Sequence, residues 1–340
     1  MRKSIKIIAI IAVLALVCAA CVSLVACNDN GNDNPTPAPQ TELRFSAPEG
    51  TPALAMLRLV TDNKEIDGYK VNYSVVKPAN IASEMASKSS DLVIMPVNAG
   101  ANLIRQGAAY KLVSVAVDGS LYMVGKTENG GALTLDDVKG KKIACIGKEG
   151  VPGLVFRYVM NKNDVELVNE DVKPNENQVS VQYVADGPAA RVLLANGSVD
   201  FAVVGEPAAT AFKGALKLNA EMDMQAEYAK ASGATTYAQA GLFVKTELAQ
   251  NKSFIDALFA ALAASKTWIN ENPSEVAAFA KANLYESAAF PPASIARCKV
   301  NATRLDDAQK SEIITFLESV MPKDSKGNAI DWQACKDLLF

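Results

Sequence analysis

The chain has 340 residues and a formal net charge of -3, from 34 basic and 37 acidic side chains, without a long block of Lys or Arg. This charge excludes the strongly basic surface of a nucleic-acid-binding protein. Histidine is absent, which removes the commonest general base and the commonest metal ligand. The cysteines after Cys27 are far apart and show no paired metal-type spacing, so we expect no metal site.

The chain begins with the order of an export signal. Basic residues lie in the first six positions, an unbroken apolar run extends from Ile7 to Ala20, and Leu24-Val25-Ala26-Cys27 closes the segment. The small residues before Cys27 resemble a bacterial lipobox, in which the cysteine is freed at its amino side and carries a diacylglyceryl group with palmitate-type chains. We therefore expect residues 1–26 to be a lipoprotein signal peptide. Lipidated Cys27 would hold the protein at the extracytoplasmic face of the cell membrane.

Other interpretations of this segment stay open. Cys21, after Ala19-Ala20, is a second candidate for lipidation. The segment could also be a plain secretion signal, or an uncleaved anchor helix, because a bilayer span needs roughly 20 apolar residues. Removal of residues 1–26 takes away three positive charges and no acid, which leaves a formal charge of -6.

Residues 27–41 are expected to form a flexible tether. After Cys27 the sequence reads NDNGNDNPTPAPQT, and such a run of Asn, Asp, Gly and Pro cannot bury a core. The folded body is expected to begin near Glu42.

A first series of alternating strands and helices follows the tether. Strands are predicted at Leu43–Ala47, Tyr69–Val76, Asp91–Met95, Leu112–Val117 and Leu121–Lys126, and helices at Pro52–Thr61, Pro78–Ser87 and Asn98–Gln106. This βαβα order predicts a largely parallel sheet with helices on both faces.

A second series starts after Gly130-Gly131. Strands are predicted at Lys142–Ile146, Val179–Val184, Asp200–Val204, around Leu216 and at Tyr237–Val244, and helices at Pro152–Asn161, at Pro188–Ala195 and from Pro207. The tail then becomes helical, over Phe254–Asn270, Ser274–Asn283 and Asp306–Val320.

The two series predict an α/β fold with two doubly wound lobes and a helical C-terminal tail. Lobe 1 is expected to hold residues 42–122 and 241–340, and lobe 2 residues 123–240. Two crossovers would join them, near Met123–Thr127 and Thr236–Ala240. A doubly wound fold without this split stays open.

Four strand-to-helix junctions could form a site, because ligands in open α/β sheets lie beyond the carboxyl ends of the strands. Two belong to each predicted lobe. Glycine lets the backbone approach a ligand, and free N–H groups of the next helix can bind an acceptor. The alternative is that these are ordinary turns and helix caps. The candidate residues at the junctions are Glu49, Gly50, Thr51, Pro96, Asn98, Gly150, Val151 and Glu206.

Three further residues are candidates near the predicted crossovers. Tyr122 and Tyr237 could stack on a planar ligand, although aromatic side chains in strands are more often core. Ser120 matters only if it lies at a hinge. No nucleophile elbow, P-loop or dinucleotide fingerprint is present, so we expect no enzyme and no cofactor.

At these junctions the chain resembles solute-binding proteins of ABC importers, in the nitrate/taurine/alkanesulfonate and thiamine-precursor-like group. The resemblance extends from about Leu43 into the helical tail. The segments that carry it are APEGTPALAMLRL (Ala47–Leu59), DLVIMPVNAGANLIRQG (Asp91–Gly107), LDDVKGKKIACIGKEGVPG (Leu135–Gly153), GPAARVLLANGSVD (Gly187–Asp200), DFAVVGEPAAT (Asp200–Thr210) and WINENP (Trp268–Pro273).

The resemblance implies a type II periplasmic-binding fold whose lobes close around a small organic solute. The protein would be a monomer that delivers this solute to ABC permease and ATPase subunits. The cleft would be lined by Gly50, Thr51, Asn98, Gly150, Val151 and Glu206. The chain departs from the family pattern at Val97, where Thr is frequent, and at Gly205, where Pro is frequent.

Two other functions stay open. Pyrimidine-precursor synthases share this fold, but they use a histidine and a cysteine-rich iron site that this chain lacks. The protein could also be a ligand-sensing or adhesive surface lipoprotein. The solute could be an organic anion or a planar heterocycle; Lys148 is the one basic residue in a junction, which disfavours a doubly charged anion.

Among the remaining cysteines, Cys145 lies in an apolar run and is expected in the core. Cys298 and Cys335 could form a disulfide outside the cell, and the sequence leaves this open.

Overall fold

The computed structural model describes residues 41–340, so the expected signal peptide, Cys27 and nearly all of the tether lie outside the described residues. Residues Gln40–Phe340 make one compact unit with apolar clusters of its own. This body therefore contains the core that a domain needs to fold alone. Within residues 41–340, no helix combines the length and the apolar character needed to cross a bilayer.

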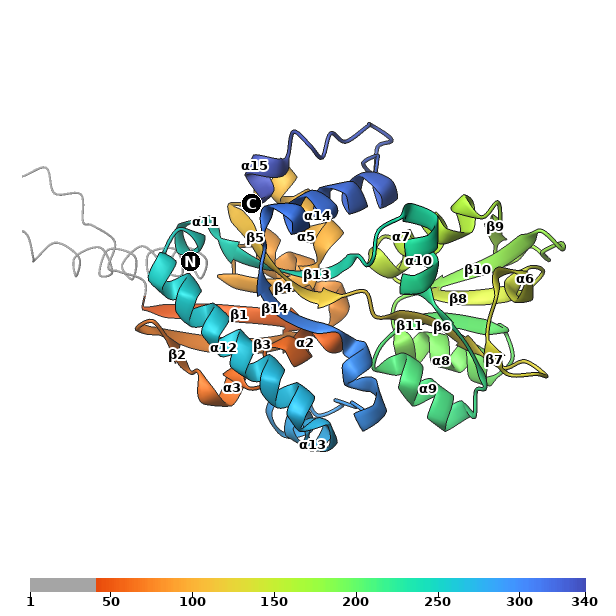
Figure 1. The fold of residues 1–340 in the computed structure, drawn as a ribbon, viewed down its shortest axis with the longest axis horizontal. Helices are drawn as coiled ribbons and strands as arrows, with labels where there is room; N and C mark the ends of the chain where they lie inside the picture. Colours follow the sequence, from red (N-terminus) through yellow and green to blue (C-terminus); the bar gives the residue numbers. More distant parts are fainter. Residues whose placement is uncertain (1–40) are drawn as a thin grey trace, which may run out of the picture. The chain divides into compact units, whose positions relative to one another are not determined.

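Two seven-stranded sheets form the body, and helices pack against both (Figure 1). We call the part built on the first sheet lobe 1 and the part built on the second sheet lobe 2. The first sheet has the order β14 (Val300–Arg304), β5 (Tyr110–Asp118), β13 (Ala238–Lys245), β4 (Leu92–Pro96), β1 (Glu42–Pro48), β3 (Tyr69–Val76) and β2 (Glu65–Ile66). The second has the order β7 (Gly131–Ala132), β12 (Ala220–Asp223), β6 (Leu121–Gly125), β11 (Phe201–Gly205), β8 (Lys142–Ile146), β10 (Gln178–Val184) and β9 (Glu166–Asn169).

The helices follow the strands in both lobes. Lobe 1 carries α2 (Thr51–Ala55), α3 (Leu59–Asp62), α4 (Ile81–Ala86), α5 (Val97–Arg105) and the tail helices α11 (Thr246–Ala249), α12 (Lys252–Glu271), α13 (Pro273–Asn283), α14 (Asp307–Val320) and α15 (Lys336–Leu339). Lobe 2 carries α6 (Leu135–Val138), α7 (Val151–Lys162), α8 (Gly187–Ala195), α9 (Ala208–Leu216) and α10 (Met224–Ser232).

The central strands are parallel, as expected. β1 runs parallel to β3 and β4, and β8 runs parallel to β10 and β11. Helices cover both faces of such strands, which explains why Leu92–Met95 and Phe201–Val204 are buried along their whole length. The two-lobed α/β fold predicted from the sequence is confirmed.

The first crossover lies earlier than predicted. Strand β6 pairs along its whole length with β11 of the second sheet, so the chain leaves lobe 1 at Gly119 and Ser120 rather than near Met123–Thr127. A Cβ atom at Gly119 would lie 2.7 Å from Gln225 and 2.8 Å from the ring of Tyr237, which explains glycine there. The return crossover lies between α10 and β13. Leu121 and Tyr122 therefore belong to lobe 2, and the other bounds given for the two lobes stay a prediction.

Several local predictions were wrong. Leu216 ends helix α9, because Lys217 takes the left-handed conformation (φ 52°), and the expected strand begins at Ala220. The predicted helix over Pro52–Thr61 is two short helices, α2 and α3. Strand β14 in the tail was missed because VNATR is short and has only two apolar residues, Val300 and Ala302.

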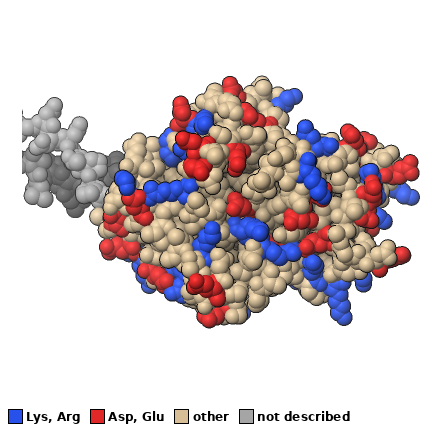
Figure 2. All heavy atoms as spheres, viewed as in Figure 1, with Lys and Arg blue, Asp and Glu red and all other residues tan. Residues whose placement is uncertain are grey.

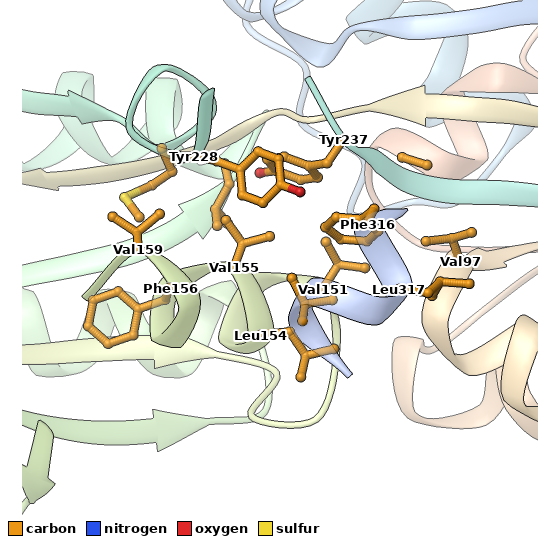
Figure 3. Packing of buried hydrophobic residues seen from close by; sticks show 14 of the residues in the cluster. Val97, Val151, Leu154, Val155, Phe156, Val159, Tyr228, Tyr237, Phe316 and Leu317 are labelled. Atoms are coloured by element: carbon orange, nitrogen blue, oxygen red, sulfur yellow. The ribbon is translucent and has the colours of Figure 1, made fainter. Parts of the chain in front are cut away.

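The largest apolar cluster continues from one lobe into the other. Val151 and Leu154 of α7 in lobe 2 lie in one buried cluster with Val97 and Leu317 of lobe 1 (Figure 3). Phe316 of α14 completes this contact. The lobes therefore meet through packed apolar side chains in this structure.

Aromatic rings extend that contact toward the return crossover. Phe316 stacks on Tyr237 with ring centroids 5.5 Å apart, and it meets Tyr228 of α10 edge-on at 5.8 Å (Figure 3). Such pairs contribute about 0.5–1.5 kcal/mol each beyond the area that they bury. Helix α14 is therefore a bridge from the tail of lobe 1 to lobe 2.

Charged side chains are mixed over the surface seen in Figure 2. Basic and acidic groups alternate there, and neither sign gathers over a large area. This face lacks the continuous basic area that nucleic-acid binding requires.

Candidate functional site

The structure brings the four strand-to-helix junctions together in pairs across the lobes. Thr51 Oγ1 donates a hydrogen bond of 2.7 Å to the carbonyl oxygen of Glu206, and Asn98 Nδ2 donates one of 2.9 Å to the carbonyl oxygen of Glu149. In lobe 1, β1 and β4 are parallel neighbours, as β8 and β11 are in lobe 2. Neighbouring strands lie about 4.8 Å apart, so the four junctions are the corners of one site.

Local backbone geometry starts the helices at these corners. Gly50 has φ 97°, a left-handed value that favours glycine, and its N–H donates to the hydroxyl of Tyr285 at 3.0 Å. Pro52 and Pro152 stand in the first turns of α2 and α7, where a missing N–H costs nothing. The sequence signal of Gly followed by Pro therefore marks both helix starts correctly.

Glu206 is the most constrained of the predicted site residues. Its side chain is fully buried, and its carboxylate accepts hydrogen bonds from the Thr210 backbone N–H at 3.1 Å and the Thr210 hydroxyl at 2.9 Å. These bonds satisfy free donors in the first turn of α9. The carboxylate is also paired with Arg297. Glu206 therefore caps the start of α9 and carries a charge that a side chain of the tail meets.

Arg297 is the functional candidate that the sequence did not reveal. It stands in a 3-10 turn, Ala296–Cys298, in the tail of lobe 1, yet its guanidinium pairs with Glu206 and Glu221 of lobe 2. The guanidinium also lies over the ring of Tyr122, 3.8 Å from its centroid. A basic residue in an irregular segment carries no pattern, so no signal in the sequence could have assigned this position.

The charges around Arg297 are balanced. Glu221 accepts from Arg297 at 3.0 and 2.7 Å and is paired with Lys213 at 3.2 Å. Burial raises the pKa of Glu221, but hydrogen bonds and charges from Arg297 and Lys213 lower this pKa by more, so the net shift is downward. Burial also raises the pKa of Tyr122 to about 12, so the phenol stays neutral.

This shift predicts a pH dependence of stability. Because the pKa of Glu221 is lower in the folded state than in the unfolded state, its contribution is complete above the unfolded value, about 4.3. The contribution is lost as the pH falls through the folded value. Urea unfolding of the body should therefore be measured at about pH 6 and at about pH 3. The free energy of unfolding should fall less between these two values for Glu221→Gln than for the native sequence.

The control for this experiment is Glu271→Gln, at an exposed glutamate that ends α12. Its loss of stability in acid should match that of the native sequence. A parallel decline for native protein and Glu221→Gln would contradict the prediction.

Three other predicted residues lie near the crossovers or the edge of the site. Ser120 is buried, and its N–H donates to Gln239 Oε1 at 2.9 Å. Tyr237 is buried in the apolar cluster and donates its hydroxyl to Gln225 at 2.7 Å. Glu49 is paired at 2.7 Å with Lys77 of its own lobe. The structure does not bring Tyr237 or Glu49 into the cross-lobe bonds. The carbonyl oxygen of Ser120 accepts from Glu206 N–H at 2.9 Å, which continues the pairing of β6 with β11.

The described cysteines are free thiols. Cys298 lies in an apolar cluster of lobe 1 and Cys335 in the cluster shared with α14, so they are not joined. Burial raises the pKa of Cys298 to about 12, which keeps the thiol unreactive. Within residues 41–340, no three side chains of Cys, Asp or Glu are grouped to hold a metal ion.

Two surface hollows lie away from the four junctions. One, of about 410 Å³, is lined by residues at the start of β1 and β4 and in β3; the other, of about 340 Å³, lies between β3 and the end of α13. Neither is lined by a junction residue. Ligand sites of α/β folds lie at the carboxyl ends of strands, so the cross-lobe junctions are the stronger candidate site.

Solved structures share this architecture. A crystal structure of an ABC transporter from Parabacteroides distasonis matches 86% of this chain and 97% of its own, with TM-score 0.67 and 21% identity. The ligand-binding component of an ABC-type import system from Staphylococcus aureus, with zinc bound, matches 82% of this chain and 91% of its own, with TM-score 0.60 and 14% identity. The alkanesulfonate-binding protein from Xanthomonas axonopodis pv. citri, bound to MOPS, matches 84% and 96%, with TM-score 0.57 and 16% identity.

No family model and no curated protein sequence matches the chain. At these low identities the structural likeness establishes the fold, which is that of periplasmic binding proteins.

Proposed function

We propose that the protein is the extracytoplasmic solute-binding component of an ABC importer. It captures a small organic solute between its lobes and delivers it to a permease with its ATPase subunits. Lipidation of Cys27 tethers it to the outer face of the cell membrane, and it acts as a monomer without catalysing a reaction. The observation that carries this proposal is the pairing of four strand-to-helix junctions across the lobes.

The geometry supports capture by closure. Thr51 and Asn98 of lobe 1 donate directly to backbone carbonyls of lobe 2, so these bonds exist only when the lobes are together. Gly150 and Val151 begin α7 directly after Glu149, whose carbonyl oxygen accepts the bond from Asn98. A solute that contacts both lobes would favour the closed state by its differential affinity for the two arrangements.

The comparisons add to this proposal. Two of the structural neighbours are named as binding components, one of an import system and one for alkanesulfonates. Binding and delivery of a solute are therefore consistent with how this fold is used, and the solute itself has to be found by experiment.

The test is a melting screen of the body, residues 41–340, against panels of organic anions, organic cations, amino acids and heterocycles. A solute at about 100 times its dissociation constant should add roughly 2.7 kcal/mol to the free energy of unfolding. Asn98→Leu should abolish that gain, because the amide joins the lobes at Glu149.

The control is Asn283→Leu, which makes the same change on the exposed end of α13 beside the smaller hollow. It should keep the full gain. If no solute of any panel stabilises the body, or if only Asn283→Leu loses the gain in stability, the result would argue against a solute held between the lobes.

A further inference from the structure

We infer that the solute is an organic cation with N–H donors, whose charged nitrogen binds where the Arg297 guanidinium lies in this structure. The inference rests on the proposed function and deepens it, because it names the chemical class of the solute. Its basis is a set of acceptors that lobe 2 and Asn98 carry where the two lobes meet.

Lobe 2 alone provides the groups that bind one cation, and we call this position the seat. The buried carboxylate of Glu206, the carboxylate of Glu221 and the ring of Tyr122 all contact one guanidinium. Lys213 neutralises one of the two carboxylates, so lobe 2 keeps one negative charge beside an aromatic face when Arg297 is absent. A carboxylate beside an aromatic ring is the arrangement that recognises positively charged nitrogen.

The present occupant of that seat belongs to the other lobe. Arg297 reaches it from a 3-10 turn in the tail of lobe 1, and its side chain is still 29% exposed. When the lobes separate, the guanidinium leaves with lobe 1, while Glu206 and Tyr122 stay in lobe 2. Separation of the lobes therefore takes the cationic partner of the Glu206 carboxylate away, so the open protein offers this carboxylate and the aromatic ring beside it to a cation from solution.

A second acceptor at the neighbouring corner is unsatisfied. Asn98 is only 3% exposed, and its Oδ1 has no hydrogen-bond partner among the described residues. Its Nδ2 donates across the lobes to the carbonyl oxygen of Glu149, which fixes the amide with Oδ1 as an acceptor. A buried acceptor of this kind requires a donor, and an N–H group of the solute supplies one.

The same acceptors disfavour an oxyanion. A sulfonate or nitrate has no hydrogen to donate to Asn98 Oδ1, and it would lie beside the buried carboxylate of Glu206. The guanidinium of Arg297 already has two carboxylate partners. Lys148 lies over the ring of Tyr183, 5.7 Å from its centroid, and is engaged there.

Binding of agmatine, tetramethylammonium and methanesulfonate to the body, measured by calorimetry, tests the inference. Agmatine carries a guanidinium with N–H donors, tetramethylammonium is a cation without them, and methanesulfonate is an anion. Agmatine should bind, and it should bind more tightly than tetramethylammonium. Glu206→Gln should weaken agmatine binding about tenfold or more, because it removes the charge that faces the solute.

The change in agmatine affinity on Arg297→Gln distinguishes a cationic solute from an anionic one. It removes the internal competitor, so agmatine should bind roughly tenfold more tightly if Arg297 occupies the seat in about nine molecules of ten. If Arg297 instead holds an anionic solute, the same variant weakens binding. Arg297→Lys, which keeps the fold if Gln does not, should show a smaller gain of the same sign.

Arg304→Gln is the matched control, because it removes one guanidinium from the same tail at an exposed ion pair with Asp256. It should leave agmatine binding unchanged. Failure of agmatine to bind any variant, or methanesulfonate binding that Arg297→Gln weakens, overturns the inference. An anion that binds and stabilises the body would leave the proposed function standing, whereas silence of every solute class overturns both.

Discussion

Arg297→Ala should lower the free energy of unfolding of the body by about 3 kcal/mol, since it leaves the carboxylate of Glu206 buried without its cation. Thr210 still donates two hydrogen bonds to this carboxylate, but neither donor carries a charge. Arg297 also covers the ring of Tyr122, so its removal takes away a cation–π contact. The measurement is urea unfolding of the native body and the variant at neutral pH.

Two further variants separate the ion pair from general damage. Arg304→Ala removes an exposed pair with Asp256, and such pairs contribute about 0–1 kcal/mol. Arg297→Met combined with Glu206→Gln removes both charges and should recover most of the loss. Equal losses for Arg297→Ala and Arg304→Ala would show that Glu206 does not depend on its cross-lobe partner.

Phe316→Ala is expected to weaken both the core and the contact between the lobes, with a loss of about 3 kcal/mol in the free energy of unfolding. Phe316 is 2% exposed and packs against Tyr237 and Tyr228 (Figure 3). Tyr237 belongs to the return crossover and Tyr228 to lobe 2. Loss of the contacts with these two rings therefore destabilises the arrangement in which the lobes are together. The radius of gyration of the body, measured by small-angle X-ray scattering, should therefore increase as well.

Phe279→Ala provides the comparison. Phe279 packs on Trp268, with ring centroids 5.1 Å apart, within the tail of lobe 1. This variant should lose stability without a change in the radius of gyration. If Phe316→Ala and Phe279→Ala change the radius alike, helix α14 does not control how the lobes meet.

The strands of the sheets were predictable because their sequences are short and apolar. Asp91–Met95 and Asp200–Val204 were identified as strands, and β4 and β11 occupy nearly those positions. Gly and Pro marked the helix starts at Thr51 and Val151. The tail was harder: β14 forms only because β5 offers an edge, and a pairing between such distant segments leaves no local pattern.

The candidate site was predictable only in part. Thr51, Asn98 and Glu206 were identified because each follows a strand, and the bonds across the lobes bring all three to one edge. Arg297 could not be found in this way, since it lies 91 positions from Glu206 in the sequence and in no regular strand or long helix.

The sequence by itself determined most of the strands and helices of the two sheets and the residues at the strand ends of the candidate site, because these depend on hydrophobic period, Gly and Pro within a few neighbouring positions. Only the tertiary structure decided which corners face each other across the lobes, and which charge meets the carboxylate of Glu206. A buried carboxylate needs a cationic partner, and this partner can come from any part of the chain that folds close to it. The pairing therefore depends on distance in space and not on order along the chain.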